Sequence, residues 1–137
     1  MYNKITLITF DSAQYIPLDF GVCNNLHGHT YQIKNLKIWT DRLIDFSIIK
    51  DFFKQMDHVI LAPEKHKPFW FAVQKLRETH TDTSLPQFKC LFLPVEMVTV
   101  EDISEWINET MKNTIKGIRC VEFELYETPT QGVVIEE

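Results

Sequence analysis

The sequence predicts an α+β domain in which an antiparallel four-stranded sheet carries its helices on one face. Three observations lead to this prediction. Several segments alternate apolar and polar residues, which is the pattern of strands, and three others have apolar residues at helical spacing. The segments follow the order strand, strand, helix, helix, strand, helix, strand. The length of 137 residues suits one domain, so we predict a single domain over residues 1–137.

The predicted strands differ in length and regularity. The second one changes its apolar phase between Ile33 and Leu36, which predicts a bulge near Lys34-Asn35. The segment before it is marked as a loop by Pro17, Asp19, Gly21 and the pair Asn24-Asn25. The four predicted strands span residues 5–10, 29–40, 88–93 and 119–127.

The predicted helices are recognised by their apolar stripes and their first residues. Asp45 or Ser47 can cap the first helix, residues 47–56. The second, residues 68–78, has Pro68 in its first turn. The third, residues 99–115, has Thr99 as its predicted N-cap, and Gly117 follows it as a stop signal.

Composition excludes several classes of function. The chain has 14 basic and 19 acidic residues and a net charge of −5, which argues against a nucleic-acid partner. Its apolar runs are too short for a membrane helix, its N-terminus has no signal-peptide pattern, and no phosphate-binding glycine motif occurs. Three cysteines without a repeated spacing indicate thiols in a reducing compartment, so we expect a cytoplasmic location.

Two histidines form the first candidate site. His27 and His29 flank Gly28 at the start of a strand, where residues two apart point to the same face. Two imidazoles can therefore converge on one metal ion, although zinc needs at least one further ligand. The alternative is a pair of polar histidines at a strand end.

Cys23 lies four residues before His27. A thiol beside a metal ion or an imidazolium has a lowered pKa and can act as a base or a nucleophile. The alternative is a small buried apolar side chain, as we expect for Cys90 and Cys120. Asp57-His58 offers an acid/base pair, a dipeptide that is also common by chance.

Glu127 has the strand parity of Val121, Phe123 and Leu125, so its carboxylate is predicted to face the apolar side of the sheet. A carboxylate in that position needs a partner. An arginine of the same chain would serve, and so would a ligand edge with two adjacent N–H donors, such as that of a pterin.

Six motifs in this order resemble the 6-pyruvoyltetrahydropterin synthase / 6-carboxytetrahydropterin synthase family over nearly the whole chain. The spaced C-x-x-x-H-G-H is the most specific of them. The motifs are FDSA at residues 10–13, CNNLHGH at 23–29, IDF at 44–46, MDHVIL at 56–61, TVED at 99–102 and YETPT at 126–130.

The resemblance implies a tunnelling fold and a homohexamer, two stacked trimers with active sites at subunit interfaces. It implies a zinc-dependent lyase that eliminates triphosphate from 7,8-dihydroneopterin triphosphate, giving 6-carboxytetrahydropterin or 6-pyruvoyltetrahydropterin, in queuosine-type or tetrahydrobiopterin-type biosynthesis. By resemblance, Cys23 is the proton-abstracting base, Asp57 and His58 complete its relay, and zinc acts as a Lewis acid. Glu127 anchors the pterin, and Thr99 and Glu101 lie at further pterin contacts.

The sequence departs from the family at two places. Gln14 stands where the family has its first zinc-binding histidine, and an amide oxygen is a weaker zinc ligand than imidazole. Zinc bound by His27, His29, water and the Gln14 amide is the preferred expectation; another divalent ion, or no metal, are the alternatives. An insertion over about residues 62–95 is the second departure. Two other functions stay open: a non-catalytic pterin-binding protein with a degraded metal site, and a dihydroneopterin aldolase-like enzyme.

Overall fold

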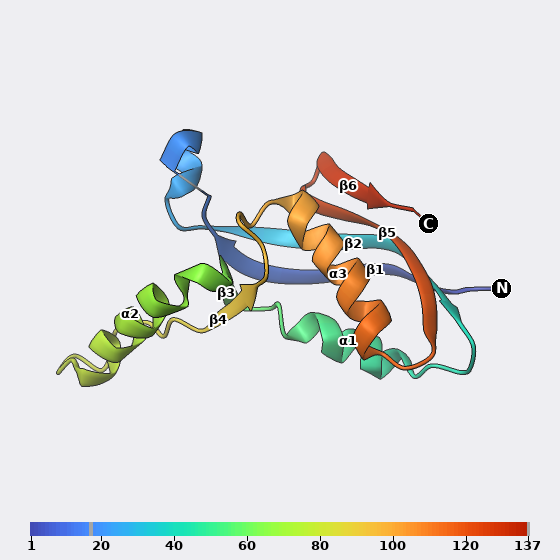
Figure 1. Cartoon of the computed structure of the whole chain (residues 1–137), viewed down its shortest axis with the longest axis horizontal. Coiled ribbons are helices and arrows are strands. Elements are labelled where there is room, and N and C mark those ends of the chain that lie inside the picture. Colours follow the sequence, from blue (N-terminus) through green and yellow to red (C-terminus); the bar gives the residue numbers. More distant parts are fainter. Residues whose placement is uncertain (17, 137) are drawn as a thin grey trace.

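A mixed sheet forms the centre of the chain. In this computed structural model, which describes residues 1–16 and 18–136 without the side chains of residues 18–20, six strands lie in the order β4-β3-β1-β2-β5-β6 (Figure 1). The three strands β4, β3 and β1 run parallel, whereas the pairs β1–β2, β2–β5 and β5–β6 are antiparallel. The strands are β1 (Asn3–Gln14), β2 (His27–Thr40), β3 (Val59–Pro63), β4 (Cys90–Leu93), β5 (Ile118–Thr128) and β6 (Gln131–Ile135).

The α+β class is confirmed, but the sheet is larger than predicted and not wholly antiparallel. The strands that the four-stranded prediction missed are β3 and β6. All five residues of β3 are buried, so it shows none of the alternation that identifies a strand with one wet face. β6 is short and follows β5 after a turn at residues 129–130. The bulge predicted in β2 is confirmed: the pairing with β5 shifts between Lys34 and Lys37, and Asn35 has a φ of 53°.

The three predicted helices are confirmed, with both ends of each helix within two residues of the prediction. Asp45 caps the first by accepting from the Ser47 N–H (2.8 Å), and Thr99 caps the third by accepting from the Asp102 N–H (3.2 Å). The loop predicted from Pro17 and the pair Asn24-Asn25 contains a 3₁₀-helix, and Pro17 itself lies outside the described residues. The helices are η1 (Leu18–Asn24), α1 (Phe46–Lys54), η2 (Glu64–His66), α2 (Lys67–Thr79) and α3 (Val100–Thr114).

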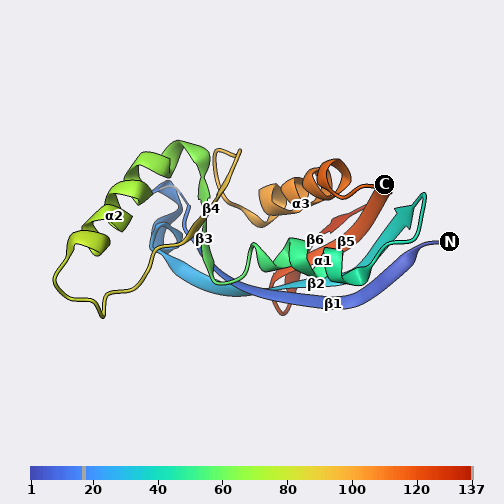
Figure 2. The same cartoon turned by 90° about the horizontal axis from the view of Figure 1, so that it is seen from below.

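The main core lies between the sheet and the helices α1 and α3, on what we call the inner face of the sheet. Figure 2 shows both helices on the same side of β1, β2 and β5. Buried residues of all three strands, such as Phe10, Ile33 and Phe123, pack with Phe53 of α1 and Ile107 of α3. No helix of the described residues has the length and apolarity needed to span a membrane.

The helix α2 differs from the prediction that all helices share one face. A second cluster joins Trp70 of α2 to Ile60 and Ala62 of β3, while the alternate residues Val59 and Leu61 belong to the main core. The strands β3 and β4 therefore separate α2 from α1 and α3, as Figure 2 shows. The helix α2 lies on the other side of β3 because both faces of this strand are buried, one against α2 and the other in the main core. This second layer is built largely by residues 62–95, whose status as an insertion in one domain stays a prediction.

Candidate active site

The inner face of β1–β2 brings the predicted metal ligands together. In the β1–β2 register, Gln14 pairs with His27 and Ser12 pairs with His29. Side chains of directly opposed residues lie on the same face of an antiparallel pair. His27, His29 and Gln14 therefore share one face, and the two imidazole rings lie 4.9 Å apart between centroids. The shared face of the two histidines, predicted from their spacing, is confirmed.

Glu127 reaches the same place from β5. Its neighbours at alternate positions, Phe123 and Leu125, are buried in the core, so Glu127 also faces inward, with a side chain 28% exposed. Its Oε1 lies 3.3 Å from Nε2 of His29. The partners of the carboxylate within the described residues are thus His29 and Gln14, and not the arginine that sequence analysis kept as an alternative.

The Gln14 amide joins Glu127 to a buried tyrosine. The Tyr31 hydroxyl donates a hydrogen bond to Oε1 of Gln14, and Nε2 of Gln14 donates to Oε2 of Glu127 (3.4 Å). Burial, and secondly the Glu127 carboxylate, hold the pKa of the Tyr31 hydroxyl above its usual range, so the hydroxyl keeps its proton and stays a donor. Tyr31 is not among the predicted site residues, although it follows His29 at the same strand parity.

These residues fit a divalent cation held by imidazole nitrogen. Nδ1 of His27 lies 2.6 Å from the Asn25 carbonyl oxygen, which leaves Nε2 for a metal, and a backbone carbonyl on the other ring nitrogen is the usual support of a metal-bound histidine. The Ser12 hydroxyl, opposite His29, is buried without a hydrogen-bond partner among the described residues. A bound cation with its water would give this hydroxyl a partner.

Asp57 and His58 lie on the other face of β1, which we call the open face. His58 Nδ1 contacts Asp57 Oδ2 (2.9 Å), and the backbone of Asp11 holds both residues: its N–H donates to Asp57 Oδ1 (2.8 Å), and its carbonyl accepts from the His58 N–H (2.6 Å). His58 has a φ of 57°, a strained backbone for a residue with a side chain. The Asp11 carboxylate in turn accepts from the Thr30 hydroxyl (2.5 Å).

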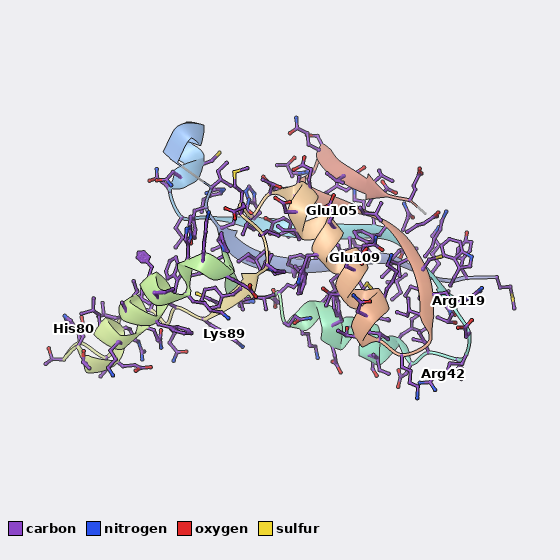
Figure 3. The ribbon with its side chains drawn as sticks, in the orientation of Figure 1. Arg42, His80, Lys89, Glu105, Glu109 and Arg119 are labelled. Atoms are coloured by element: carbon purple, nitrogen blue, oxygen red, sulfur yellow. The ribbon has the colours of Figure 1, made fainter. Side chains whose placement is uncertain are left out.

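A cleft of about 570 Å³ adjoins this pair, and its lining also includes Ser12 and His29. Ala13 and Gly28, which oppose each other in the register, are among its small lining residues. His58 and Lys89 also line the cleft, and Figure 3 labels Lys89 beside β4, whereas His80 lies at the far end of α2. One cluster among the described residues brings three atoms of His, Cys, Asp or Glu that could bind a metal within 4.8 Å of one another. It consists of Asp11, Asp57 and His58. Hydrogen bonds within the cluster account for this proximity.

The Asp57–His58 contact shifts both groups in the direction of an ion pair. The backbone hydrogen bond from Asp11, and then the one from His58, lower the pKa of Asp57 below its ordinary 3.8. The hydrogen bond to Asp57, and then its charge, raise the pKa of His58 above 6.5. The ion pair therefore stabilises the fold fully between these two ordinary values. Its contribution is lost as the pH rises through the raised pKa of His58 or falls through the lowered pKa of Asp57.

Asp57→Asn is expected to bring the pKa of His58 back toward 6.5, because the amide removes the negative charge that favours the imidazolium. The measurement is an NMR titration of the histidine ring protons in both proteins. The control for the fold is the rest of the NMR spectrum at one fixed pH, which should be the same in the two proteins. An unchanged His58 titration would contradict the contact.

The remaining predicted site residues lie at the ends of elements. Cys23 is exposed on η1, which Figure 1 shows at the end of β1–β2 remote from the chain termini. Thr99 uses its hydroxyl to cap α3, and Glu101 is exposed in the first turn of that helix. Among the described residues, no hydrogen bond or ion pair joins Thr99 or Glu101 to Glu127. No disulfide forms among the three cysteines.

A sequence profile of the 6-pyruvoyl tetrahydropterin synthase family matches residues 4–137. The chain belongs to this family. Family membership identifies it as a lyase of the 6-pyruvoyl tetrahydropterin synthase type, and it confirms the resemblance found in the motifs.

Curated relatives and solved structures support the same family. The 6-carboxy-5,6,7,8-tetrahydropterin synthase of Haemophilus influenzae is 31% identical over the full length of both chains. A putative enzyme of the same name from Pyrococcus abyssi is 26% identical, covering 88% of this chain and 80% of that one. The crystal structure of 6-pyruvoyl tetrahydropterin synthase from Plasmodium vivax superposes with a TM-score of 0.62 at 20% identity, covering 98% of this chain and 97% of that one. An uncharacterized protein of Wolinella succinogenes reaches 0.65 at 18% identity, covering 98% of each chain. These structures confirm the tunnelling fold.

Proposed function

We propose that the chain eliminates triphosphate from 7,8-dihydroneopterin triphosphate and that its product is 6-carboxytetrahydropterin, with 6-pyruvoyltetrahydropterin as the alternative product. The observation that carries the proposal is the position of Glu127. Its carboxylate lies on the inner face beside His29 and is partly exposed, so it can accept two N–H donors from the edge of a pterin. The names of the curated relatives favour the 6-carboxy product, and with it a queuosine-type pathway and a cytoplasmic location.

Each site residue has a role in this proposal. Glu127 binds and orients the pterin ring, with Thr99 and Glu101 as further contacts. Cys23 removes a proton from the substrate side chain, and the Asp57–His58 pair relays it, since a carboxylate that favours the imidazolium equips the histidine to take up and return a proton. His27 and His29 would hold Zn²⁺, which when bound supplies Lewis-acid stabilisation of negative charge on side-chain oxygens of the substrate.

The distribution of these residues over two faces supports an assembly with shared active sites. His27, His29 and Glu127 lie on the inner face of the sheet, whereas Asp57 and His58 lie on the open face beside Asp11. The cleft beside His58 is lined by His29 as well, but neither His27 nor Glu127 contributes to its lining. A second copy of the chain that supplies Asp57 and His58 would complete the site, which favours the proposed homohexamer built as a dimer of trimers.

The direct test is incubation of the purified protein, with zinc supplied, with 7,8-dihydroneopterin triphosphate. We expect release of triphosphate and a new pterin whose mass identifies it as the 6-carboxy or the 6-pyruvoyl product. Absence of turnover with zinc supplied would contradict the enzyme proposal. Turnover that resists chelators and does not need the triphosphate would instead indicate the aldolase-like alternative.

A second candidate function, a pterin-binding protein without catalysis, rests on Gln14. The amide that replaces a third imidazole already accepts a hydrogen bond from Tyr31, so fewer strong donors remain for a metal. This candidate predicts tight pterin binding, abolished by Glu127→Ala, in protein that contains no metal.

Gln14→His is expected to raise the zinc content of the protein, because a third imidazole completes the ligand set typical of catalytic zinc. The measurement is metal analysis of both proteins after equilibration with limiting zinc. Full and equal occupancy in both would show that Gln14 does not weaken the site, and no zinc in either protein would exclude the zinc mechanism.

A further inference from the structure

We infer that Gln14 is a positioning residue that holds the Glu127 carboxylate in place for the pterin, and that it is not a metal ligand. The inference rests on the proposed function, since it explains how this chain orients the group that binds the pterin. It departs from the expectation that the Gln14 amide oxygen joins His27 and His29 on zinc.

The orientation of the Gln14 amide follows from its two neighbours. Glu127, as a carboxylate, offers only acceptors, so the Gln14 atom that faces it must be the amide nitrogen. The oxygen then faces the Tyr31 hydroxyl, which is fully buried and donates to it. A flipped amide would place an oxygen against a carboxylate and leave the amide N–H groups toward the tyrosine. With Gln14 only 4% exposed, water cannot compensate for such a mismatch.

Glu127 is held by Gln14 at Oε2, and its Oε1 contacts Nε2 of His29, one of the proposed metal ligands. Oε2 accepts from the Gln14 amide at 3.4 Å, and Oε1 lies 3.3 Å from His29 Nε2. Each carboxylate oxygen has a further lone pair available, so these contacts leave acceptor capacity for a ligand. Restricting the rotation of a glutamate before the ligand arrives reduces the entropy lost on binding. The chain Tyr31–Gln14–Glu127 is thus a support for one carboxylate.

The same geometry disfavours Gln14 as a ligand. A neutral amide oxygen competes poorly with imidazole for zinc. The nearest polar atom to this oxygen is a hydroxyl donor, whose hydrogen carries partial positive charge and opposes an approaching cation. A cation beside His27 and His29 therefore takes water or substrate oxygens at its remaining positions.

The test compares Gln14→Leu with the matched control Gln32→Leu, a glutamine of β2 on the open face. The probe is neopterin, a fluorescent and unreactive pterin, and zinc content is measured in the same samples. We expect Gln14→Leu to weaken neopterin binding about tenfold, the effect of a hydrogen bond to a charged group, without a change in zinc content. Tyr31→Phe, which frees the amide to rotate, should weaken binding less and in the same direction. The control should bind as the parent does.

Loss of zinc in Gln14→Leu with unchanged neopterin binding would overturn the inference in favour of a ligand role. A double-mutant cycle of Gln14→Leu and Glu127→Ala on the unfolding equilibrium adds a measurement that needs neither metal nor pterin. We expect the two effects on the unfolding constant to be non-additive by at least about threefold. Additive effects would overturn the inference. A parent protein that binds no neopterin would overturn the proposed function, and the double-mutant cycle would then decide whether Gln14 holds Glu127.

Discussion

Glu127→Gln is expected to weaken neopterin binding about 100-fold and to lower kcat/KM for the triphosphate substrate by a similar factor. The two side chains have the same shape, so the variant changes chemistry and not packing. A carboxylate accepts both N–H donors of a pterin edge, whereas an amide accepts one and opposes the second with its own N–H groups. Loss of one hydrogen bond to a charged group, with the other bond now accepted by a neutral amide, is worth about 3 kcal/mol, or about two orders of magnitude in affinity.

The control for this substitution is Glu124→Gln on the same strand. Glu124 points to the open face, where its Oε2 accepts from the Asn35 side chain (2.8 Å). It carries the same charge as Glu127 and should bind neopterin as the parent does. The measurement is a fluorescence titration of neopterin with each protein. Equal affinity of Glu127→Gln and the parent would contradict the role of Glu127 as the pterin anchor.

Local patterns in the sequence were sufficient for the three helices, for four of the six strands and for half of the site. The spacing of His27 and His29 placed two imidazoles on one face because strand geometry repeats every two residues. The parity of Glu127 with Phe123 and Leu125 likewise placed its carboxylate inward. These predictions needed only the period of the strand in which each residue lies.

Contacts between distant strands could not be predicted from such patterns. The pairing of Ser12 with His29 depends on the β1–β2 register, and that register decides which residues meet Gln14. Nothing within β1 alone indicates that a tyrosine 17 positions later would hold its amide. The same holds for Asp11, whose backbone fixes Asp57 and His58 across 46 positions of sequence.

The separation of the site residues between two faces has the same origin. The family resemblance alone predicts that Asp57 and His58 form one relay with Cys23. All residues of β3 are buried, and β3 pairs with β1 at Ser12 and Ala13. This pairing brings His58, the residue before β3, beside Asp11. A strand without alternation gives no sign in the sequence of which face its neighbours occupy.

Cys23→Ala is expected to lower turnover of 7,8-dihydroneopterin triphosphate by about 10²–10⁴-fold, the range for loss of a general base. Neopterin binding should stay within about twofold of the parent, because Cys23 lies on η1 and makes no contact with Glu127 among the described residues. The change thus falls on kcat, in contrast to the effect of Glu127→Gln on affinity.

The matched control is Cys90→Ala, in β4. Burial raises the pKa of the Cys90 thiol to about 11, so this sulfur stays protonated and unreactive at neutral pH. Cys23 is exposed, and iodoacetamide should therefore alkylate it before Cys90 and abolish turnover in the parent and in Cys90→Ala alike. Cys23→Ala with the full kcat of the parent would exclude this thiol as the base, and it would shift the proton transfer to Asp57 and His58.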